Sequence, residues 1–337
     1  MKRTLTEETP KLIGKKVKLA GWVDTRRDHG KIVFLDLRDS TGILQMVFTP
    51  RAKQPYKEVE PIRTEWVIEV EGTVNERPDN MKNTDIPTGV VELEVEKLTV
   101  LSPSETPPFP IDTDGYEIGE EVRLKYRYLD LRRKRLQRNL RLRSDYVRAA
   151  REYLFSKDFV EIETPLLTKS TPEGSRDFVV PSRIYPGKFF ALPQSPQQYK
   201  QLLMAGGFEK YFQISKALRD EDPRADRAFE HTQIDLEMSF VDQKDVMELV
   251  EGMTIAASEA IGATIASKPF PIITYQEAME KYGADKFDLR TEKEKKAGVL
   301  SLAWVVDFPF FEKTDDDKWT FTHNPFSTPA NKEHEKW

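Results

Sequence analysis

The sequence contains no cysteine, and it has only four histidines among its 337 residues. Without cysteine there can be no disulfide and no thiolate zinc site, and four histidines are too few to suggest a histidine-rich metal centre. A chain without disulfides fits a reducing compartment. We therefore expect a cytoplasmic protein.

Long apolar runs and a general basic charge are also missing. No run approaches the ~18–20 apolar residues of a membrane-spanning helix, so we expect no membrane contact. The N-terminal stretch MKRTLTEETPKLIGK lacks the apolar core of a secretory signal. The formal net charge is −5, so any RNA contact has to come from local basic patches.

What is present first is a β-rich N-terminal part, residues 16–101. Five short runs alternate apolar and polar residues: KVKLAGWV, KIVFLDLRD, ILQMVF, WVIEVEGTV and VVELEVEKLTVL. Turn signals separate several of them, and a longer polar segment follows the third. This order predicts a five-stranded OB-fold barrel, a fold that commonly binds oligonucleotides.

A proline-rich stretch, SPSETPPFPID at residues 102–112, follows the β-rich part. Such stretches often mark domain boundaries. We predict an OB-fold domain over residues 1–102, a hinge over 103–125 and a second domain over 126–337. The basic segment 123–151 has two interpretations, a solvated helix face or, beside an OB-fold, a contact for the RNA backbone.

The second domain mixes helix and strand patterns. Apolar positions recur at helical spacing over about 139–155, and the strand pattern of FVEIETPLLT then stops at Pro165. In PQSPQQYKQLLMAGG, Ser195 predicts a helix N-cap, Pro196 a first helical residue and Gly206 the helix end.

The runs YFQISKAL and HTQIDLEMSF predict a long β-hairpin around the charged segment RDEDPRADRAFE. In its second strand one face carries Ile234, Leu236, Met238 and Phe240, and the other carries His231, Gln233, Asp235 and Glu237. The polar face is either the solvated side of a sheet or the floor of a ligand site. In the second interpretation Arg219 would aim a guanidinium, suited to phosphate or carboxylate, over that floor.

Three stretches in this order, TPLLTKSTPEGSRDF, ALPQSPQQYKQLL and ALRDEDPRADRAFEHTQIDLE, resemble the bacterial type of aspartyl-tRNA synthetase, a class II aminoacyl-tRNA ligase. The resemblance runs over nearly the whole chain. It implies an α+β fold: an OB-fold barrel for the anticodon, then a class II synthetase-like antiparallel sheet flanked by helices, C-terminally incomplete. It also implies activation of L-aspartate by ATP and Mg²⁺, transfer to tRNA(Asp), and a homodimer.

The resemblance assigns roles at the substrate site. Arg219 and Glu221 are the expected catalytic residues, with Arg219 between the ATP α-phosphate and the substrate carboxylate. Aspartate-binding residues would be Glu173, Ser195, Gln197, Lys200, Arg219, Gln233, Asp235 and His323; ATP-binding residues would be Arg219, Asp220, Glu221 and His231. Lys200 would pair with the substrate's side-chain carboxylate. No metal ligand is expected within this chain.

In the first domain the resemblance assigns anticodon contacts to Arg27, Phe34, Gln45 and Glu92. An aromatic platform with neighbouring polar groups suits an unstacked RNA loop. The alternative for Phe34 is a place in the core. The turn DHG, with His29, resembles enzymes that charge both tRNA(Asp) and tRNA(Asn); the alternative is a plain exposed turn.

The chain also departs from the resemblance. The inserted domain that usually follows a stretch like YGADKFDLR is absent, as are the metal-binding acids and the third class motif. We therefore expect an incomplete copy that does not form aspartyl-adenylate, and aspartate-dependent ATP–pyrophosphate exchange by this chain would contradict that expectation. Ala228 replaces a glutamine that is common near ATP in the family, which puts that contact in doubt, and Asn324 stands where a second histidine is common.

Two other functions fit part of the sequence. One is a non-catalytic relative that binds tRNA, although the presence of Arg219, Glu173 and Lys200 argues against it. The other is an asparaginyl- or lysyl-tRNA ligase, against which Lys200 and the RDEDPRADR segment favour aspartate.

Overall fold

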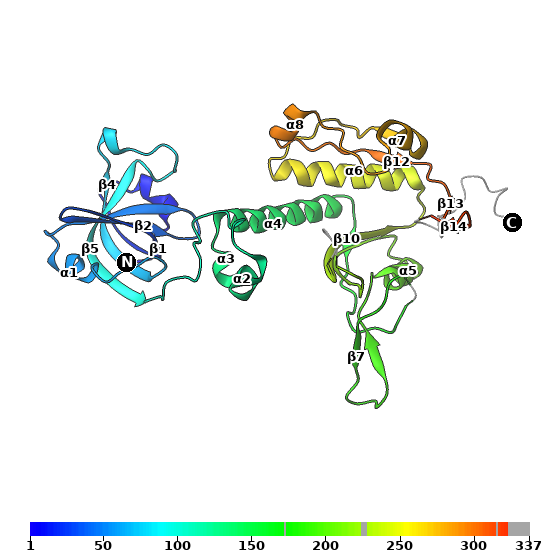
Figure 1. Cartoon of the computed structure of the whole chain (residues 1–337), viewed down its shortest axis with the longest axis horizontal. Helices are drawn as coiled ribbons and strands as arrows, with labels where there is room; N and C mark the ends of the chain where they lie inside the picture. Colours follow the sequence, from blue (N-terminus) through cyan, green and yellow to red (C-terminus); the bar gives the residue numbers. More distant parts are fainter. Residues whose placement is uncertain (172, 224–227, 315, 323–337) are drawn as a thin grey trace. The chain divides into compact units, whose positions relative to one another are not determined.

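The computed structural model describes the chain except residues 172, 224–227, 315 and 323–337, and it divides into two compact units, Met1–Gln137 and Arg138–Trp337 (Figure 1). The domain limits expected at residues 102 and 126 stay a prediction. Each unit is described by itself.

The first unit contains a closed five-stranded barrel. Its strands are β1 (Lys16–His29), β2 (Ile32–Arg38), β3 (Ile43–Phe48), β4 (Val67–Glu76) and β5 (Val91–Ser102), in the order β1-β2-β3-β5-β4. Strands β3 and β5 are parallel, and the other pairs are antiparallel. Three short helices accompany it: η1 (Thr6–Lys11), α1 (Lys53–Glu58), in the long connection after β3, and η2 (Asp79–Met81). The predicted OB-fold is confirmed.

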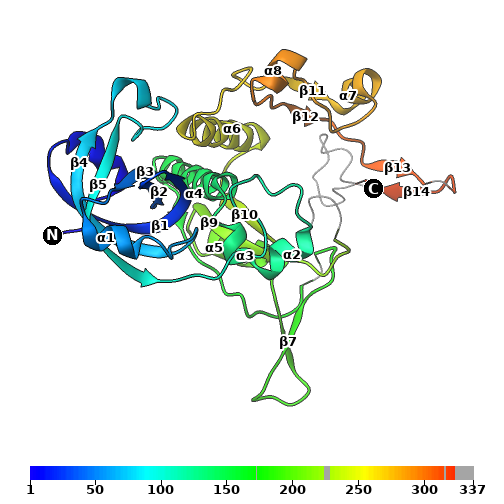
Figure 2. The same ribbon diagram turned by 60° about the vertical axis from the view of Figure 1, so that its left-hand side comes forward.

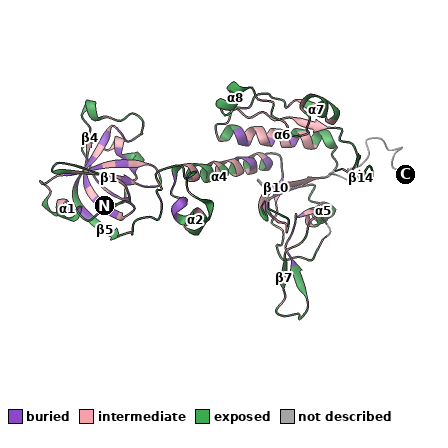
Figure 3. Cartoon of the chain, in the orientation of Figure 1, coloured by how far each residue is buried: buried purple, intermediate pink, exposed green. Residues whose placement is uncertain are grey.

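Alternation along the strands builds the barrel core. In β3, Leu44, Met46 and Phe48 are buried, and the residues between them are half-buried. Figure 3 shows buried and partly exposed residues mixed along the barrel strands. In β2, Leu35 and Leu37 face the same core. Burying each such side chain contributes roughly 1.5–3 kcal/mol. The side chains between them face outward, where polar groups such as Gln45 are tolerated.

A buried arginine holds the segment that follows the barrel. Helices α2 (Glu120–Lys125) and α3 (Arg127–Asp130) precede Arg133, which is fully buried. Its guanidinium donates to Asp130 Oδ1 at 2.8 Å, to the Thr113 carbonyl at 2.8 Å and to the Pro110 carbonyl at 2.7 Å. Several arginines of the basic segment thus serve the protein's own structure, since Arg127 also donates to Asp130 at 2.8 Å.

The second unit contains a three-stranded sheet in the order β10-β9-β6, with β9 (Lys210–Leu218) and β10 (Glu230–Met238) antiparallel and β6 (Val160–Glu161) parallel to β9. Helices α4 (Lys134–Phe155) and α6 (Gln243–Ala260) cover one face, and α5 (Gln197–Ala205) lies on the other (Figures 1 and 2). The predicted α+β class, a sheet flanked by helices, is confirmed.

The face toward α4 and α6 is the apolar core of this unit. Leu154 and Met253 of the helices pack there with Phe212 of β9 and with Ile234 and Leu236 of β10. The expectation that Phe240 joins this face is wrong: β10 ends at Met238, and Phe240 has a φ of 59° and is 93% exposed.

Smaller elements complete the second unit. They are β7 (Val179–Pro181), β8 (Phe189–Ala191), β11 (Ile272–Thr274), α7 (Tyr275–Tyr282), α8 (Glu292–Lys296), β12 (Trp304–Val306), β13 (Phe311–Lys313) and β14 (Trp319–Phe321). Strands β7 and β8 form a hairpin, β11 and β12 a parallel pair, and β13 and β14 a second hairpin. Helix α4 starts before the expected residue 139, and β6 is shorter than FVEIETPLLT predicts.

Candidate functional site

The register of β9 and β10 gathers polar side chains on the sheet face next to α5. Tyr211 lies directly opposite Glu237, and Gln213 lies opposite Asp235. Directly opposed residues of antiparallel strands share a face. His231, Gln233, Asp235 and Glu237 therefore line the same side of the sheet, as the alternation in HTQIDLEM predicts. We call this face the polar floor.

Lys200 reaches the polar floor from α5. Its Nζ lies 3.0 Å from Asp235 Oδ1 and 3.2 Å from Glu237 Oε2. The side chains of Lys200 and Asp235 are only 12% and 11% exposed. Burial raises the pKa of the Asp235 carboxyl, and the nearby ammonium of Lys200 opposes that shift. Removing an ammonium and its carboxylate partners from water costs free energy, which their mutual attraction offsets only when the geometry is good. Such a cluster is therefore weak evidence for stability and fits a functional site better.

Arg219 directly follows β9 and approaches the same face. Its backbone N–H donates to the Phe229 carbonyl at 2.8 Å, and its Nε lies 3.4 Å from the Gln194 carbonyl oxygen. Arg219 continues the alternation of Tyr211 and Gln213 along β9. Its contact at Gln194 lies just before α5, so the guanidinium is on the same side of the sheet as the Lys200 ammonium. The apolar core with Phe212 and Leu236 lies on the opposite face of the sheet.

Glu173 and Ser195 meet beside the start of α5. Ser195 Oγ donates to Glu173 Oε2 at 2.5 Å and accepts from the Gln197 N–H at 3.3 Å. The helix begins at Gln197, one residue later than predicted, with Pro196 in the cap position. Ser195 still satisfies one of the free N–H groups of the first turn.

Gln194 is a residue that the sequence interpretation missed. Its side chain is buried, accepts from the Ser175 N–H at 3.1 Å and donates to the Ser175 carbonyl at 3.0 Å and to Asp177 Oδ1 at 2.5 Å. It thereby ties the loop that carries Glu173 to the segment that carries Ser195. A single glutamine in ALPQSPQQ gives no pattern from which this role could be predicted.

Four buried polar atoms near the polar floor have no hydrogen-bond partner among the described residues. They are Ser175 Oγ, Tyr211 Oη, Gln233 Oε1 and Asp235 Oδ2. Native proteins leave few such atoms, and a cluster of them usually marks a place for water or a ligand. This cluster supports a ligand site on the floor.

The remaining residues of the expected ATP site are placed less tightly. The Asp220 N–H donates to the Arg176 carbonyl at 3.0 Å, Glu221 is exposed, and His231 is half-buried opposite Ala217. His323 and Asn324 lie outside the described residues, as does part of the RDEDPRADR segment.

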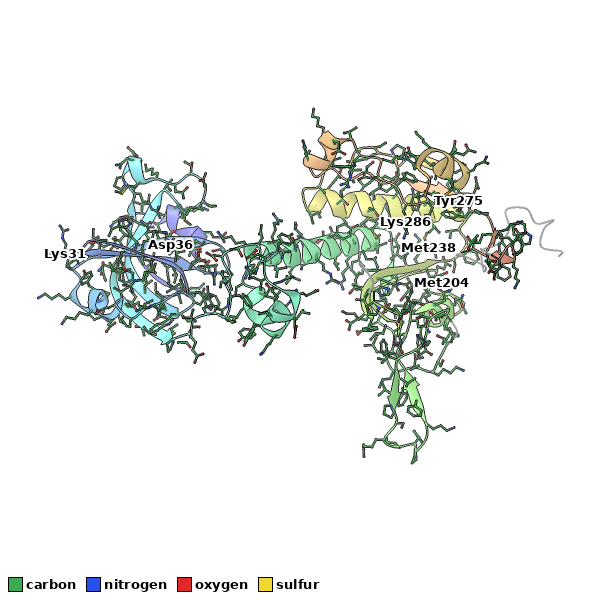
Figure 4. All side chains as sticks on the ribbon, in the orientation of Figure 1. Lys31, Asp36, Met204, Met238, Tyr275 and Lys286 are labelled. Carbon is green, nitrogen blue, oxygen red and sulfur yellow. The ribbon has the colours of Figure 1, made fainter. Side chains whose placement is uncertain are left out.

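A second polar cluster lies on the outside of the barrel in the first unit. Arg27 makes a forked contact with Asp36 at 2.8 and 2.9 Å, and its NH2 lies 3.3 Å from Gln45 Oε1. Gln45 in turn donates to Glu92 Oε2 at 2.8 Å. Asp36, labelled in Figure 4, was missed as a candidate although the alternation in KIVFLDL places it on the same face as Phe34.

Phe34 belongs to this outer cluster and is not part of the barrel core. It is half-buried and lies directly opposite Arg27, whereas Leu35 next to it faces inward. The ring of His29 meets Phe34 edge to face, with centroids 5.9 Å apart. An aromatic ring, a forked cation, one amide and two carboxylates thus share one surface.

No group of three or more His, Asp or Glu side chains with metal-binding geometry occurs in the part of the chain that the structure describes. None of the described helices combines the length and the apolar composition that a bilayer crossing requires.

Comparison with known proteins gives the family. Residues 119–336 match the model described as tRNA synthetases class II (D, K and N), and residues 17–101 match the OB-fold nucleic acid binding domain. The Aspartate–tRNA(Asp/Asn) ligase of Rubrobacter xylanophilus is 53% identical over 300 residues, which are 89% of this chain and 50% of that protein. The Aspartate–tRNA ligase of Staphylococcus haemolyticus is 50% identical over 307 residues, 91% of this chain and 52% of that protein.

A solved structure agrees with these matches. Asparaginyl-tRNA synthetase from Pyrococcus horikoshii, complexed with asparaginyl-adenylate, aligns with a TM-score of 0.72 and 27% identity over 88% of this chain and 71% of that one. The chain spans about half the length of the curated relatives it matches. The class II model covers most of the second unit, and the aspartate–tRNA ligases share half of their aligned residues with this chain, so the chain belongs to the class II tRNA synthetases (D, K and N).

Proposed function

We propose that this chain carries the substrate and anticodon sites of an aspartate–tRNA ligase, which activates L-aspartate with ATP and transfers it to tRNA(Asp). One observation carries the proposal: the cations of Lys200 and Arg219 approach the same polar face, beside buried polar atoms that have no hydrogen-bond partner in the described part of the chain. Two cations suit the two carboxylates of aspartate. The names of the relatives support the same substrate.

The chemistry needs little from the protein besides position and charge. The α-carboxylate of aspartate is already an anion, so it attacks the α-phosphorus of ATP without a general base, and pyrophosphate leaves. Arg219 would neutralise charge that builds during this step, which is worth roughly 3–4 kcal/mol by analogy with oxyanion donors. Holding the two reactants together supplies much of the remaining rate.

The other floor residues would orient the amino acid. Glu173, Gln233 and Asp235 offer oxygen acceptors for the substrate ammonium, and Gln233 Oε1 is buried without a partner among the described residues. Lys200 would receive the side-chain carboxylate. Asparagine would present a neutral amide there, without the charge that attracts the Lys200 ammonium, and mismatches of this kind can discriminate by about 10⁴-fold.

Magnesium is expected with the ATP. The described residues do not supply a carboxylate cluster for it, so no step is assigned to a protein-held metal ion. Glu221 and Asp220, which carry acids next to Arg219, remain candidates for contact with the nucleotide.

Homodimer formation belongs to the same proposal. Leu140 and Phe155 of α4, Val160 of β6 and the neighbouring Leu166 and Leu167 are between 44% and 54% exposed. Exposed apolar side chains of this number, along a helix and the segment after it, are available to a subunit interface. A cytoplasmic location is part of the proposal as well.

Binding of L-aspartate tests the substrate assignment directly. We expect isothermal titration calorimetry to detect binding of L-aspartate and to detect no binding of L-asparagine at the same concentration. Arg219→Ala should weaken aspartate binding roughly 30-fold or more, because a partly buried charge loses its partner. Arg183→Ala, an exposed cation between β7 and β8, is the matched control and should bind as the parent does.

Two results would contradict the assignment. Equal binding of both amino acids would remove the role of Lys200 in specificity. Binding of tRNA(Asp) without any binding of L-aspartate would favour the non-catalytic, tRNA-binding relative.

The outer cluster of the barrel predicts how the chain treats two tRNAs. We propose that Arg27, Phe34, Gln45 and Glu92 contact the anticodon and that His29 admits tRNA(Asn) as well. His29→Leu should weaken tRNA(Asn) binding about ten-fold, since one ring–base contact is worth about 1–3 kcal/mol, and should leave tRNA(Asp) nearly unchanged.

Filter binding with both tRNA transcripts measures this effect. Lys31→Leu, in the same turn (Figure 4), is the control: losing a general phosphate contact should weaken both tRNAs alike. A parent chain that already prefers tRNA(Asp) strongly would remove the role of His29.

A further inference from the structure

The hydroxyl of Tyr211 has no role in the site as proposed so far. Tyr211 lies on β9, opposite Glu237 and diagonal to Asp235 on the polar floor. Its side chain is completely buried, and Oη has no hydrogen-bond partner among the described residues. A buried tyrosine hydroxyl normally finds an acceptor.

The acceptor without a partner is on the neighbouring carboxylate. Oδ1 of Asp235 accepts from the Lys200 ammonium at 3.0 Å, whereas Oδ2 is buried and has no hydrogen-bond partner within the part of the chain that the structure describes. The charged groups that face this carboxylate are Lys200 from α5 and Glu237 from β10, and Tyr211 faces it from β9. The Tyr211 hydroxyl and Asp235 Oδ2 are therefore a donor and an acceptor that face one another, each without another partner among the described residues.

The electrostatics of the pair agree with this geometry. Burial, followed by the charge of Asp235, raises the pKa of the Tyr211 hydroxyl. Tyr211 is therefore neutral, and able only to donate its proton to an anion, over the whole working pH range. In the opposite direction, Tyr211 lowers the pKa of Asp235, against the larger effect of burial.

We propose that Tyr211 is a positioning residue whose hydroxyl donates to Asp235 Oδ2 and so holds the carboxylate that orients the ammonium of Lys200. The proposal rests on the proposed function for what Lys200 recognises. Without the hydroxyl, the Asp235 carboxylate can turn and offer both oxygens to Lys200. The ammonium is then held more closely by the protein and is less available to the substrate's side-chain carboxylate.

Tyr211→Phe removes only the hydroxyl and keeps the ring that packs in the floor. Tyr199→Phe is the matched control, because the Tyr199 hydroxyl donates to Thr168 Oγ1 at 2.9 Å and takes no part in the Lys200 cluster. The first readout is the NMR signal of the Asp235 carboxyl carbon, measured as a function of pH in protein labelled with ¹³C at aspartate. The signal is assigned by its absence from the spectrum of Asp235→Asn. Its pKa should rise in Tyr211→Phe and stay at the parent value in Tyr199→Phe.

The second readout is ligand binding by calorimetry. Tyr211→Phe should bind L-aspartate about ten-fold more weakly, as expected for loss of one hydrogen bond to a charged group, and should bind ATP as the parent does. Tyr199→Phe should bind both ligands as the parent does.

The outcomes separate the inference from the proposed function. An unchanged Asp235 pKa in Tyr211→Phe would overturn the inference whatever the ligands do. A raised pKa with unchanged aspartate affinity would show a hydrogen bond of purely structural value and would also overturn it. If the parent chain bound no aspartate while the pKa still rose, the hydrogen bond would stand, and the positioning role would fall with the proposed function.

Discussion

Lys200→Met should lower the free energy of unfolding by about 3 kcal/mol, because removing one member of a buried ion pair leaves the other without compensation. Methionine fills nearly the same volume, so the loss is electrostatic. Asp235 and Glu237, both within 3.2 Å of the lysine ammonium in the parent, would then face one another without a cation. L-aspartate binding should disappear as well.

The matched control is an exposed ion pair between β9 and β10. Lys216 of β9 pairs with Glu230 of β10 at 2.6 Å, but their side chains are 52% and 54% exposed. Exposed pairs contribute little, so Lys216→Met should unfold at the parent's denaturant midpoint. Urea denaturation followed by fluorescence and circular dichroism gives both values.

A double variant separates charge from packing. Lys200→Met with Asp235→Asn removes the cation and one of its two anions together. We expect it to recover much of the lost stability but none of the aspartate binding. A single variant as stable as the parent would show that the ammonium is not a compensating charge, and the account of the polar floor would be wrong.

Asp130→Asn should have an effect of similar size in the first unit. Asp130 and Arg133 are both completely buried, and Arg127 donates to the same carboxylate. Asparagine keeps the volume but removes the negative charge, which leaves the Arg133 guanidinium buried with neutral acceptors only. A loss of about 3–5 kcal/mol is typical when a buried ion pair is broken in this way.

The loss should be local to the segment that Arg133 holds. Hydrogen exchange by mass spectrometry should show faster exchange over residues 110–115, whose carbonyls at Pro110 and Thr113 accept from Arg133. Asp145→Asn, which breaks the exposed contact with Arg148 at 3.3 Å, is the control and should leave exchange unchanged. Equal exchange over residues 110–115 in both variants would show that the Asp130–Arg133 pair does not hold this segment.

The same carboxylate predicts a pH dependence. Burial alone would raise the pKa of Asp130, but the hydrogen bond from Arg133 and the charges of the surrounding arginines outweigh it, so its pKa lies below the ordinary value of 3.8. A lowered folded-state pKa contributes stability that is present above the unfolded pKa and is lost as the pH falls through the folded one. Protection of residues 110–115 should therefore hold at neutral pH and fail only below about pH 4.

Much of the fold could be predicted because alternation and turn signals are local. The barrel strands repeat with a period of two, so patterns such as ILQMVF specify both the strand and its inward face. Gly206 and Ser195 marked the ends of α5 to within one residue, since caps depend on neighbouring backbone groups. Phe240 was misplaced because nothing in its own pattern shows where pairing with β9 stops.

The site could be predicted only where the charge of a residue by itself indicates the ligand group that it can bind. The cations of Arg219 and Lys200 and the acids of β10 are of that kind. Gln194, Tyr211 and Asp36 are not, because each acts through a partner that is distant in the sequence or on another strand. Arg133 is similar: its carbonyl partners lie about twenty residues earlier, and no periodicity connects them.

Strand β9 alternates between residues of the apolar core and residues of the polar floor, which limits how its sequence can evolve. Phe212 belongs to the apolar core, while Tyr211 and Gln213 on either side of it belong to the polar floor. Mutations that alter thermal stability and mutations that alter ligand preference therefore fall on alternate residues of the same strand. Insertion or deletion of a single residue there would exchange the two roles at once, so divergence along this strand should proceed by substitution alone.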